Sequence, residues 1–280
     1  MKTNFLLAVL AVGACGSVWS ATPLTESTFT EIIREANVVA AISKSTTPAV
    51  TNMIFHAPDL VRTGPASRVE MTAPDQTITR VGANTVFTFE PGGRNIQLEK
   101  GSVLFHPPAG VGGGTVKYRG TAAAVLGTTM VCVVLPDGRF KILDLEGHVK
   151  VSLQSGIYIY LEAGQMVIVS TDGKEFSAVL FFNLAELVNR LELVVGFSKA
   201  LSSLPLIITA IQLQNDQISA GTLLHLVSFL LATTGLEITS GPRLPPWMLN
   251  APDHTQYYIS PTQTLPYQPW TGGDAYGIRN

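Results

Sequence analysis

The sequence is poor in charged residues and nearly free of cysteine. Charged residues make up 14% of the 280 residues, against roughly 25% in typical soluble domains. The formal net charge is −2, so the chain has no bulk field that would attract nucleic acid or an anionic membrane. No basic cluster that would follow a phosphate backbone occurs. The composition therefore argues against a nucleic-acid-binding protein.

Two cysteines occur, Cys15 and Cys132. We expect Cys15 to be removed with an N-terminal segment, which would leave Cys132 alone and without an intrachain disulfide. Cys132 lies in an apolar strand pattern, where a free cysteine packs as a small hydrophobic residue. A nucleophilic thiol needs polar, electropositive surroundings instead. The sequence therefore predicts no catalytic cysteine.

Motifs for catalysis and metal binding are also missing. There is no His-Glu-x-x-His and no Gly-x-Ser-x-Gly elbow, and the glycine-rich stretch 110–117 lacks the Gly-Lys-Ser/Thr ending of a phosphate loop. The five histidines are isolated in sequence, although folding could join His106 and His148 with Asp144 or Glu146 at a zinc ion. We predict no enzyme activity, no cofactor and no metal.

Asp144 and Glu146 are the pair of acidic residues most like a catalytic pair. They are two residues apart on an expected strand, so we expect them to project from one strand face. Their separation would lie near the lower edge of the roughly 5 to 9.5 Å that glycosidases use. Because no desolvating pocket is evident, we expect Glu146 to bond to the backbone at the corner before Gly147.

Residues 1–20 have the pattern of a secretory signal peptide. Lys2 precedes an apolar run, and small residues lead to a cleavage site after Ser20 or Ala21. Two alternatives are a buried N-terminal helix and lipoprotein processing, since residues 12–15 resemble a lipobox that would acylate Cys15. We expect an exported protein, either periplasmic or extracellular.

Short strands separated by turn residues dominate the chain from residue 61 to residue 170. Asp137-Gly138 and Asp172-Gly173 suit hairpin turns. Residues 21–45 fit both a helical stripe and strand alternation. The pattern predicts an all-β fold of about 10–12 strands, a short β-solenoid or a β-sandwich, with a barrel as a further alternative. We expect strands at residues 67–71, 77–81, 85–90, 95–100, 102–106, 114–118, 122–126, 130–135, 139–145, 148–154, 156–162 and 166–170.

The pattern becomes helical after Phe181. Apolar residues recur at helical spacing between residues 184 and 195, and Pro205 is expected to open a second helix that runs to about residue 214. Residues 218–236 carry no formal charge and could be mistaken for a membrane span. Because threonine, serine and histidine dilute this stretch and basic flanks are missing, we interpret it as a packed or amphipathic helix.

The chain is thus expected to have four parts. Residues 1–20 form the signal peptide, 21–180 the β domain and 181–239 a small helical segment. Residues 240–280 are rich in proline and aromatic residues without periodicity, which is typical of a disordered tail.

Six elements in order resemble the FecR-like domain, a periplasmic module of iron-transport signalling regulators. They are residues 61–71, 79–85, 98–104, 124–128, 143–151 and 161–165, and the resemblance covers about residues 29 to 170. It implies an all-β domain that is not an enzyme. The motif residues, to which we assign a structural role, are Arg80, Gly82, Asn84, Thr85, Gly101, Gly127, Thr128, Glu146, Gly147 and Gly164.

The chain also departs from those regulators. In them, a cytoplasmic anti-sigma segment and a membrane helix precede the domain, whereas here we expect only a signal peptide before it. Leu126 stands where the regulators place arginine. We therefore do not expect direct control of a sigma factor.

The leading hypothesis is a non-enzymatic module that binds an envelope protein or a cell-wall polymer and acts in interaction or sensing. A second hypothesis is self-assembly into a homo-oligomer, through open strand edges or through residues 218–236. A third is carbohydrate binding, because Tyr158 and Tyr160 share a strand face and could stack on sugar rings.

Overall fold

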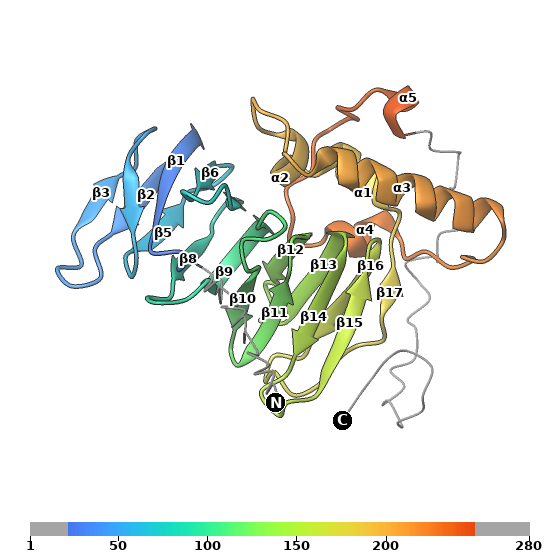
Figure 1. The fold of residues 1–280 in the computed structure, drawn as a ribbon, viewed down its shortest axis with the longest axis horizontal. Helices are drawn as coiled ribbons and strands as arrows, with labels where there is room; N and C mark the ends of the chain where they lie inside the picture. Colours follow the sequence, from blue (N-terminus) through green and yellow to red (C-terminus); the bar gives the residue numbers. More distant parts are fainter. Residues whose placement is uncertain (1–21, 250–280) are drawn as a thin grey trace, which may run out of the picture.

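The structure is a computed structural model that describes residues 22–249. The expected signal peptide, Cys15 and residues 250–280 lie outside the described residues. Two β-sheets pack face to face, and helices cover the outer face of one of them (Figure 1). This arrangement confirms the all-β class with a helical C-terminal segment, in the form of a β-sandwich.

Sheet A contains the strands β4-β1-β6-β7-β9-β12-β13-β16-β17 in spatial order, and sheet B contains β3-β2-β5-β8-β9-β10-β11-β14-β15. Their bounds are β1 (Glu26–Ile33), β2 (Ala36–Val39), β3 (Thr46–Pro48), β4 (Ile54–His56), β5 (Leu60–Thr63), β6 (Arg68–Thr72), β7 (Ile78–Val81), β8 (Val86–Phe89), β9 (Asn95–His106), β10 (Gly114–Tyr118), β11 (Thr121–Val125), β12 (Thr129–Val134), β13 (Phe140–Glu146), β14 (His148–Ser152), β15 (Tyr158–Glu162), β16 (Gln165–Val169) and β17 (Leu180–Phe181).

Strand β9 belongs to both sheets and joins them. Its first half, up to Lys100, pairs with β8 in sheet B, and its second half, from Gly101, pairs with β12 in sheet A. Because side chains alternate along a strand, the two faces of sheet A serve two cores. Met130 and Cys132 pack between the sheets, whereas Val131 and Val133 pack against the helices.

Five helices follow the strands among the described residues: α1 (Leu184–Arg190), α2 (Glu192–Val195), α3 (Leu204–Ser219), α4 (Phe229–Thr233) and α5 (Pro246–Leu249). Asn183 caps α1 by accepting a hydrogen bond from the Glu186 N–H at 2.9 Å. Pro205 lies in the first turn of α3, as expected. No helix among residues 22–249 is both long enough and apolar enough to cross a lipid bilayer.

Eleven of the strands, β6 to β16, correspond to the expected ones, with residues 95–100 and 102–106 merged in β9. The expected number of strands was too low, because β1 to β5 and β17 add to them. Residues 26–39, left ambiguous by the sequence pattern, form strands β1 and β2. Both Asp-Gly turns are confirmed by Gly138 and Gly173 at φ of 86° and 71°.

The expected helix over residues 218–236 is wrong. α3 ends at Ser219, and of the remaining residues only Phe229–Thr233 are helical, in α4. The N–H of Val227 instead donates to the carbonyl of Phe181 at 2.7 Å, so this part of the stretch is extended. The described part of the expected tail includes α5, with Leu249 buried against α3.

Candidate functional site

The outer face of sheet A carries three polar side chains that bind the ends of helices. They are Arg80 on β7, Thr129 on β12 and Lys141 on β13, and each has 0% exposure. A buried charge is costly unless it is paired and hydrogen-bonded. Their contacts therefore show how the helical segment is held on the sheet.

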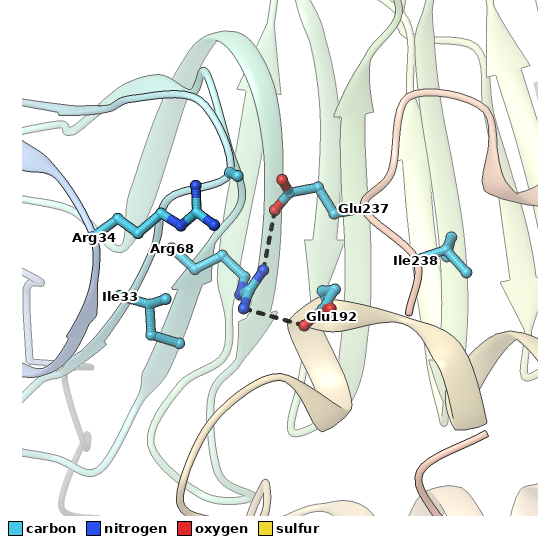
Figure 2. Close-up of a pocket in the computed structure, with 7 residues that line it drawn as sticks. Ile33, Arg34, Arg68, Glu192, Glu237 and Ile238 are labelled. Carbon is cyan, nitrogen blue, oxygen red and sulfur yellow. Dashed lines mark hydrogen bonds and ion pairs between the residues drawn. The ribbon is translucent and has the colours of Figure 1, made fainter. Parts of the chain in front are cut away.

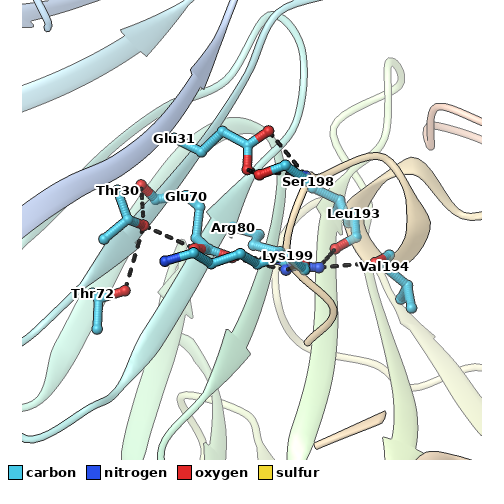
Figure 3. Close-up of polar contacts among 9 residues, drawn as sticks. All are labelled: Thr30, Glu31, Glu70, Thr72, Arg80, Leu193, Val194, Ser198 and Lys199. Carbon is cyan, nitrogen blue, oxygen red and sulfur yellow. Dashed lines mark hydrogen bonds and ion pairs between the residues drawn. The ribbon is translucent and has the colours of Figure 1, made fainter. Parts of the chain in front are cut away.

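Arg80 binds the C-terminal end of α2 and the loop that follows it (Figure 3). Its guanidinium donates to the carbonyls of Leu193 at 3.2 Å, Val194 at 2.8 Å and Lys199 at 2.7 Å. Its Nε donates to the Glu70 carboxylate at 2.8 Å. The planar fork of donors allows one arginine to serve all these acceptors, which a lysine could not do.

The surroundings of Arg80 complete this network. The Phe197 ring lies 4.4 Å from the guanidinium carbon, in a cation–π contact. The second oxygen of Glu70 accepts from the Thr30 hydroxyl at 2.8 Å. Glu31, on the same strand as Thr30, accepts from the Ser198 N–H and hydroxyl at 3.0 and 2.6 Å. Arg80 on β7 and Glu31 on β1 thus hold the loop after α2 through charge-assisted bonds, and Glu70 on β6 holds Arg80 in place.

Thr129 lies at the centre of a second buried cluster. Its hydroxyl is 2.7 Å from Glu146 Oε1, 2.7 Å from Ser203 Oγ and 3.0 Å from His106 Nδ1. Ser203 is the N-cap residue of α3 but makes no side-chain capping bond to that helix. Ser203 instead ties the start of α3 to sheet A.

Burial controls the protonation of this cluster. Burial raises the pKa of Glu146 to about 7, although the hydrogen bond from Thr129 favours the carboxylate and lowers this pKa. Burial also lowers the pKa of His106 below its usual value, which favours the neutral ring. Asp144, fully buried nearby, has a pKa raised well above its usual value by burial and by the charge of Glu146.

Lys141 binds the C-terminal end of α4. Its ammonium donates to the carbonyls of Leu231, Ala232 and Thr234 at 3.3, 2.7 and 2.7 Å. A cation is favoured at a helix C-terminus, where carbonyl groups lack intrahelical partners. Burial lowers the pKa of Lys141 to about 7, because removal from water disfavours the charged ammonium.

An open cleft lies beside these contacts, between the ends of β1 and β6 and the start of α2 (Figure 2). Its volume is about 470 Å³. Arg68 crosses it and pairs with Glu192 at 3.2 Å and Glu237 at 3.5 Å. Arg34 lines the cleft and is exposed to solvent. The remaining lining residues are Ile33, Ala66 and Ile238.

The first group of motif residues forms the corner where β9 changes sheet. Thr85 accepts a hydrogen bond from the Ser102 N–H at 2.9 Å. Gly101 has a φ of 84°, and a Cβ there would lie 2.5 Å from the Thr85 Cα. Gly82 packs as closely on Ser102, and Asn84 has a φ of 52° in the turn.

The second group repeats this arrangement at the corner between β13 and β14. A Cβ on Gly147, at a φ of 87°, would lie 2.3 Å from the Thr128 Cγ2. Gly127 lies in the turn before Thr128, and Gly164 packs on the Gln214 side chain of α3. Each corner therefore places a glycine against a threonine, which suits the structural role predicted for them.

Glu146 and Asp144 differ from expectation. The Glu146 carboxylate accepts from the Thr129 hydroxyl, not from the expected backbone N–H. A register shift opposite Thr129 and Met130 breaks the strand alternation on which a shared face for the two carboxylates depended. Asp144 and Glu146 are both buried, with exposures of 0% and 6% respectively, so this pair is closed to a sugar substrate.

The two histidines that folding could have joined at a metal ion do not come together. His106 lies 3.8 Å from Glu146 in the Thr129 cluster, whereas His148 is exposed on sheet B opposite Glu162. Within residues 22–249, no group of three or more His, Cys, Asp or Glu side chains is placed to hold a metal ion. Cys132 is fully buried, and burial raises the pKa of its thiol.

Tyr158 and Tyr160 lie side by side on the outer face of sheet B. Their ring centroids are 5.6 Å apart, and the ring planes are nearly perpendicular at 80°. The Lys150 ammonium covers the Tyr158 ring at 4.0 Å, and Tyr160 is 50% exposed. Tyr160 is therefore the more accessible ring of the two, and their binding role stays a prediction.

Sequence reasoning did not identify Glu70, Lys141 or Ser203. The sequence did mark Lys141, because a lysine within an apolar strand must either reach solvent or find hydrogen-bond acceptors. No sequence pattern marked Glu70 or Ser203, since their partners lie far away in the sequence.

Comparisons with known proteins agree with the strand series. Residues 59–150, which are 92 of the 280 residues, match the model of the family described as "FecR protein". The resemblance is therefore confirmed for that stretch. No curated protein matches the chain.

Two solved structures are similar in part, both titled as a "putative anti-sigma factor" from Parabacteroides distasonis ATCC 8503. They share 19% and 18% identity with this chain, each with a TM-score of 0.40. The alignments cover 47% of this chain, and 66% and 65% of theirs. The chain thus spans just under two thirds of the length of these structures.

Proposed function

We propose that this chain, which carries the FecR match over residues 59–150, is a non-enzymatic module that senses or binds another component of the cell envelope. The family match is the observation that carries the proposal. The signal-peptide pattern of residues 1–20 supports a location outside the cytoplasm.

The chemistry of the polar clusters supports a binding role over catalysis. Ser203, Thr129 and His106 resemble groups that enzymes use, yet their exposures are 1%, 0% and 5%. Their polar atoms bond to one another. A catalytic group must reach the proton or atom on which it acts, whereas these groups are used to fix α3 on sheet A.

The open cleft at Arg34 and Arg68 is the place where we expect a partner to bind. Its volume of about 470 Å³ lies within the usual range for ligand sites, roughly 300–1,000 Å³. It is lined by two arginines and two glutamates and by no aromatic ring. Mixed charge without a stacking surface suits a protein segment with charges of both signs better than a sugar chain.

Export is tested by fusing the chain to an alkaline phosphatase that lacks its own signal and is active only outside the cytoplasm. We expect activity from the full-length fusion and none from a matched fusion that begins at residue 22. Equal inactivity of both fusions would contradict export.

Partner binding is tested with a photoreactive amino acid at position 34, where Arg34 lines the cleft. Position 42 serves as the control, because Ile42 is 98% exposed and does not line the cleft. We expect a defined envelope protein to crosslink at position 34 only, and Glu237→Lys to reduce the yield. Equal crosslinking at both positions, or turnover of a peptide or glycan by the purified chain, would overturn the proposal.

A further inference from the structure

Each sheet ends in two edge strands, and β15 differs from the other three edges. Strands β3 and β4 have 3 residues each and β17 has 2, whereas β15 has 5. β15 pairs with β14 over all five residues without a register shift. It contains no proline, lysine or arginine. Edge strands are usually shortened, bulged or charged to prevent pairing with another chain, and β15 has few of these protections.

The backbone of β15 presents free hydrogen-bonding groups along its outer edge. The Leu153 N–H donates to the Ile157 carbonyl at 2.8 Å, which sets the alternation of bonded pairs in the β14–β15 hairpin. Ile159 and Leu161 therefore bond to β14, and the N–H and C=O groups of Tyr158 and Tyr160 point away from it. Within the described part of the chain, no hydrogen bond is recorded for these outward groups.

Glu162 limits this free edge at its end. Its N–H is occupied by the Gln165 side chain, which accepts at 3.0 Å, so only its carbonyl remains available. An incoming strand that accepts from Tyr158 and exchanges both bonds with Tyr160 would thus match the free groups.

We propose that two copies of this chain pair through β15 as an antiparallel, twofold-symmetric ribbon centred on Tyr160. Tyr160 then faces Tyr160 of the partner subunit, and Tyr158 faces Glu162 of the partner subunit. Each Tyr160 exchanges bonds with its symmetry mate, and each Tyr158 N–H donates to the opposite residue 162 carbonyl. Such isologous pairing closes after two copies.

Charge complementarity favours a second copy as the occupant. The Lys150 ammonium lies over the Tyr158 ring, next to the position that Glu162 of the partner subunit takes in this register. The twofold axis places Lys150 of each subunit beside Glu162 of the partner subunit, so this pair of opposite charges occurs twice. Pairs of opposite charge on neighbouring strands are favourable. Ile159 and Leu161 stay on the inner face, at 5% and 0% exposure. This inference stands independently of the proposed function.

The test is the oligomeric state of the full chain by analytical ultracentrifugation over a concentration series. We expect a monomer–dimer equilibrium, and Tyr160→Pro should abolish the dimer because it removes a free N–H at an edge that tolerates proline. Glu162→Lys should weaken dimerisation roughly tenfold, and Lys150→Glu with Glu162→Lys should restore it. The matched control is Glu99→Lys, which makes the same charge change at an exposed residue of β9 and should leave the dimer intact.

Register is tested with a short bismaleimide, which should join two Tyr160→Cys chains more efficiently than two Tyr158→Cys chains. A measurement without mutations guards against misfolded variants: amide exchange at Tyr158 and Tyr160 should slow as protein concentration rises. A monomer at every soluble concentration, or a dimer unaffected by Tyr160→Pro, would overturn the proposal. Amide exchange at these two residues that does not depend on concentration would do the same.

Discussion

Replacement of Arg80 by methionine removes the charge that holds the loop after α2. The variant leaves Glu70, only 5% exposed, without its cation. The carbonyls of Leu193, Val194 and Lys199 lose their donor as well. Breaking a buried ion pair from one side costs about 3–5 kcal/mol, and each unpaired buried carbonyl adds to that cost unless water reaches it.

We therefore expect Arg80→Met to lower the free energy of unfolding by about 4 kcal/mol, a large part of the 5–15 kcal/mol typical of a domain. Urea unfolding followed by circular dichroism measures this loss, provided that the m value is unchanged. The matched control is Arg139→Met, because Arg139 pairs with Asp137 at side-chain exposures of 47% and 52%. That pair should contribute no more than about 1 kcal/mol. Equal losses in the two variants would refute the reasoning.

Three further predictions follow from the corners and the helix-covered face. Burial raises the pKa of Glu146 from 4.5 to about 7, so its neutral form stabilises the fold most below pH 4.5, and this stabilisation is lost as pH rises to about 7. The free energy of unfolding should therefore fall by roughly 1–3 kcal/mol over that range, and Glu146→Gln should flatten the dependence of this free energy on pH. Gly147→Ala should destabilise the fold by about 1–3 kcal/mol more than Gly156→Ala, because an added Cβ meets Thr128 at the first site and nothing within 4 Å at the second. Adding Thr128→Ser to Gly147→Ala should recover part of the lost stability in urea unfolding. No recovery would contradict a clash between the added Cβ and Thr128. Ending the chain at residue 180 uncovers the apolar cluster between sheet A and the helices, so light scattering should show aggregates, whereas a soluble folded monomer would show that the helices are dispensable.

The central strands were predictable because their signals are local. Turn glycines and alternating apolar residues marked β6 to β16 within a few residues of their ends. The N-terminal strands gave weaker signals. Phe29 and Glu31 flank a register shift in β1, after which Ile32 packs on the same core as Phe29. A spacing of three residues between core positions fits a helical stripe equally well.

The failed helix over residues 218–236 shows where composition misleads. The stretch is apolar because Leu226 and Val227 are buried, and burial favours apolar residues in any backbone conformation. Gly221 and Gly235, both at positive φ, mark turns within this stretch. Tertiary packing against Phe181 then fixed an extended path that no local pattern indicated.

The site was predictable only in part, for a similar reason. The motif placed Arg80 among structural residues, but its acceptors Leu193 and Val194 lie 113 and 114 positions further along the chain. Backbone carbonyls have no sequence signal at all. The attachment of the helices to sheet A thus required the folded structure.

Native-state hydrogen exchange tests the central claim most directly, namely that the helical segment and sheet A form one cooperative unit held by buried polar contacts. Amides of α3 and of β12 should then open with the same free energy, close to that of global unfolding. Exchange of α3 at a free energy several kcal/mol below that of β12 would contradict the claim.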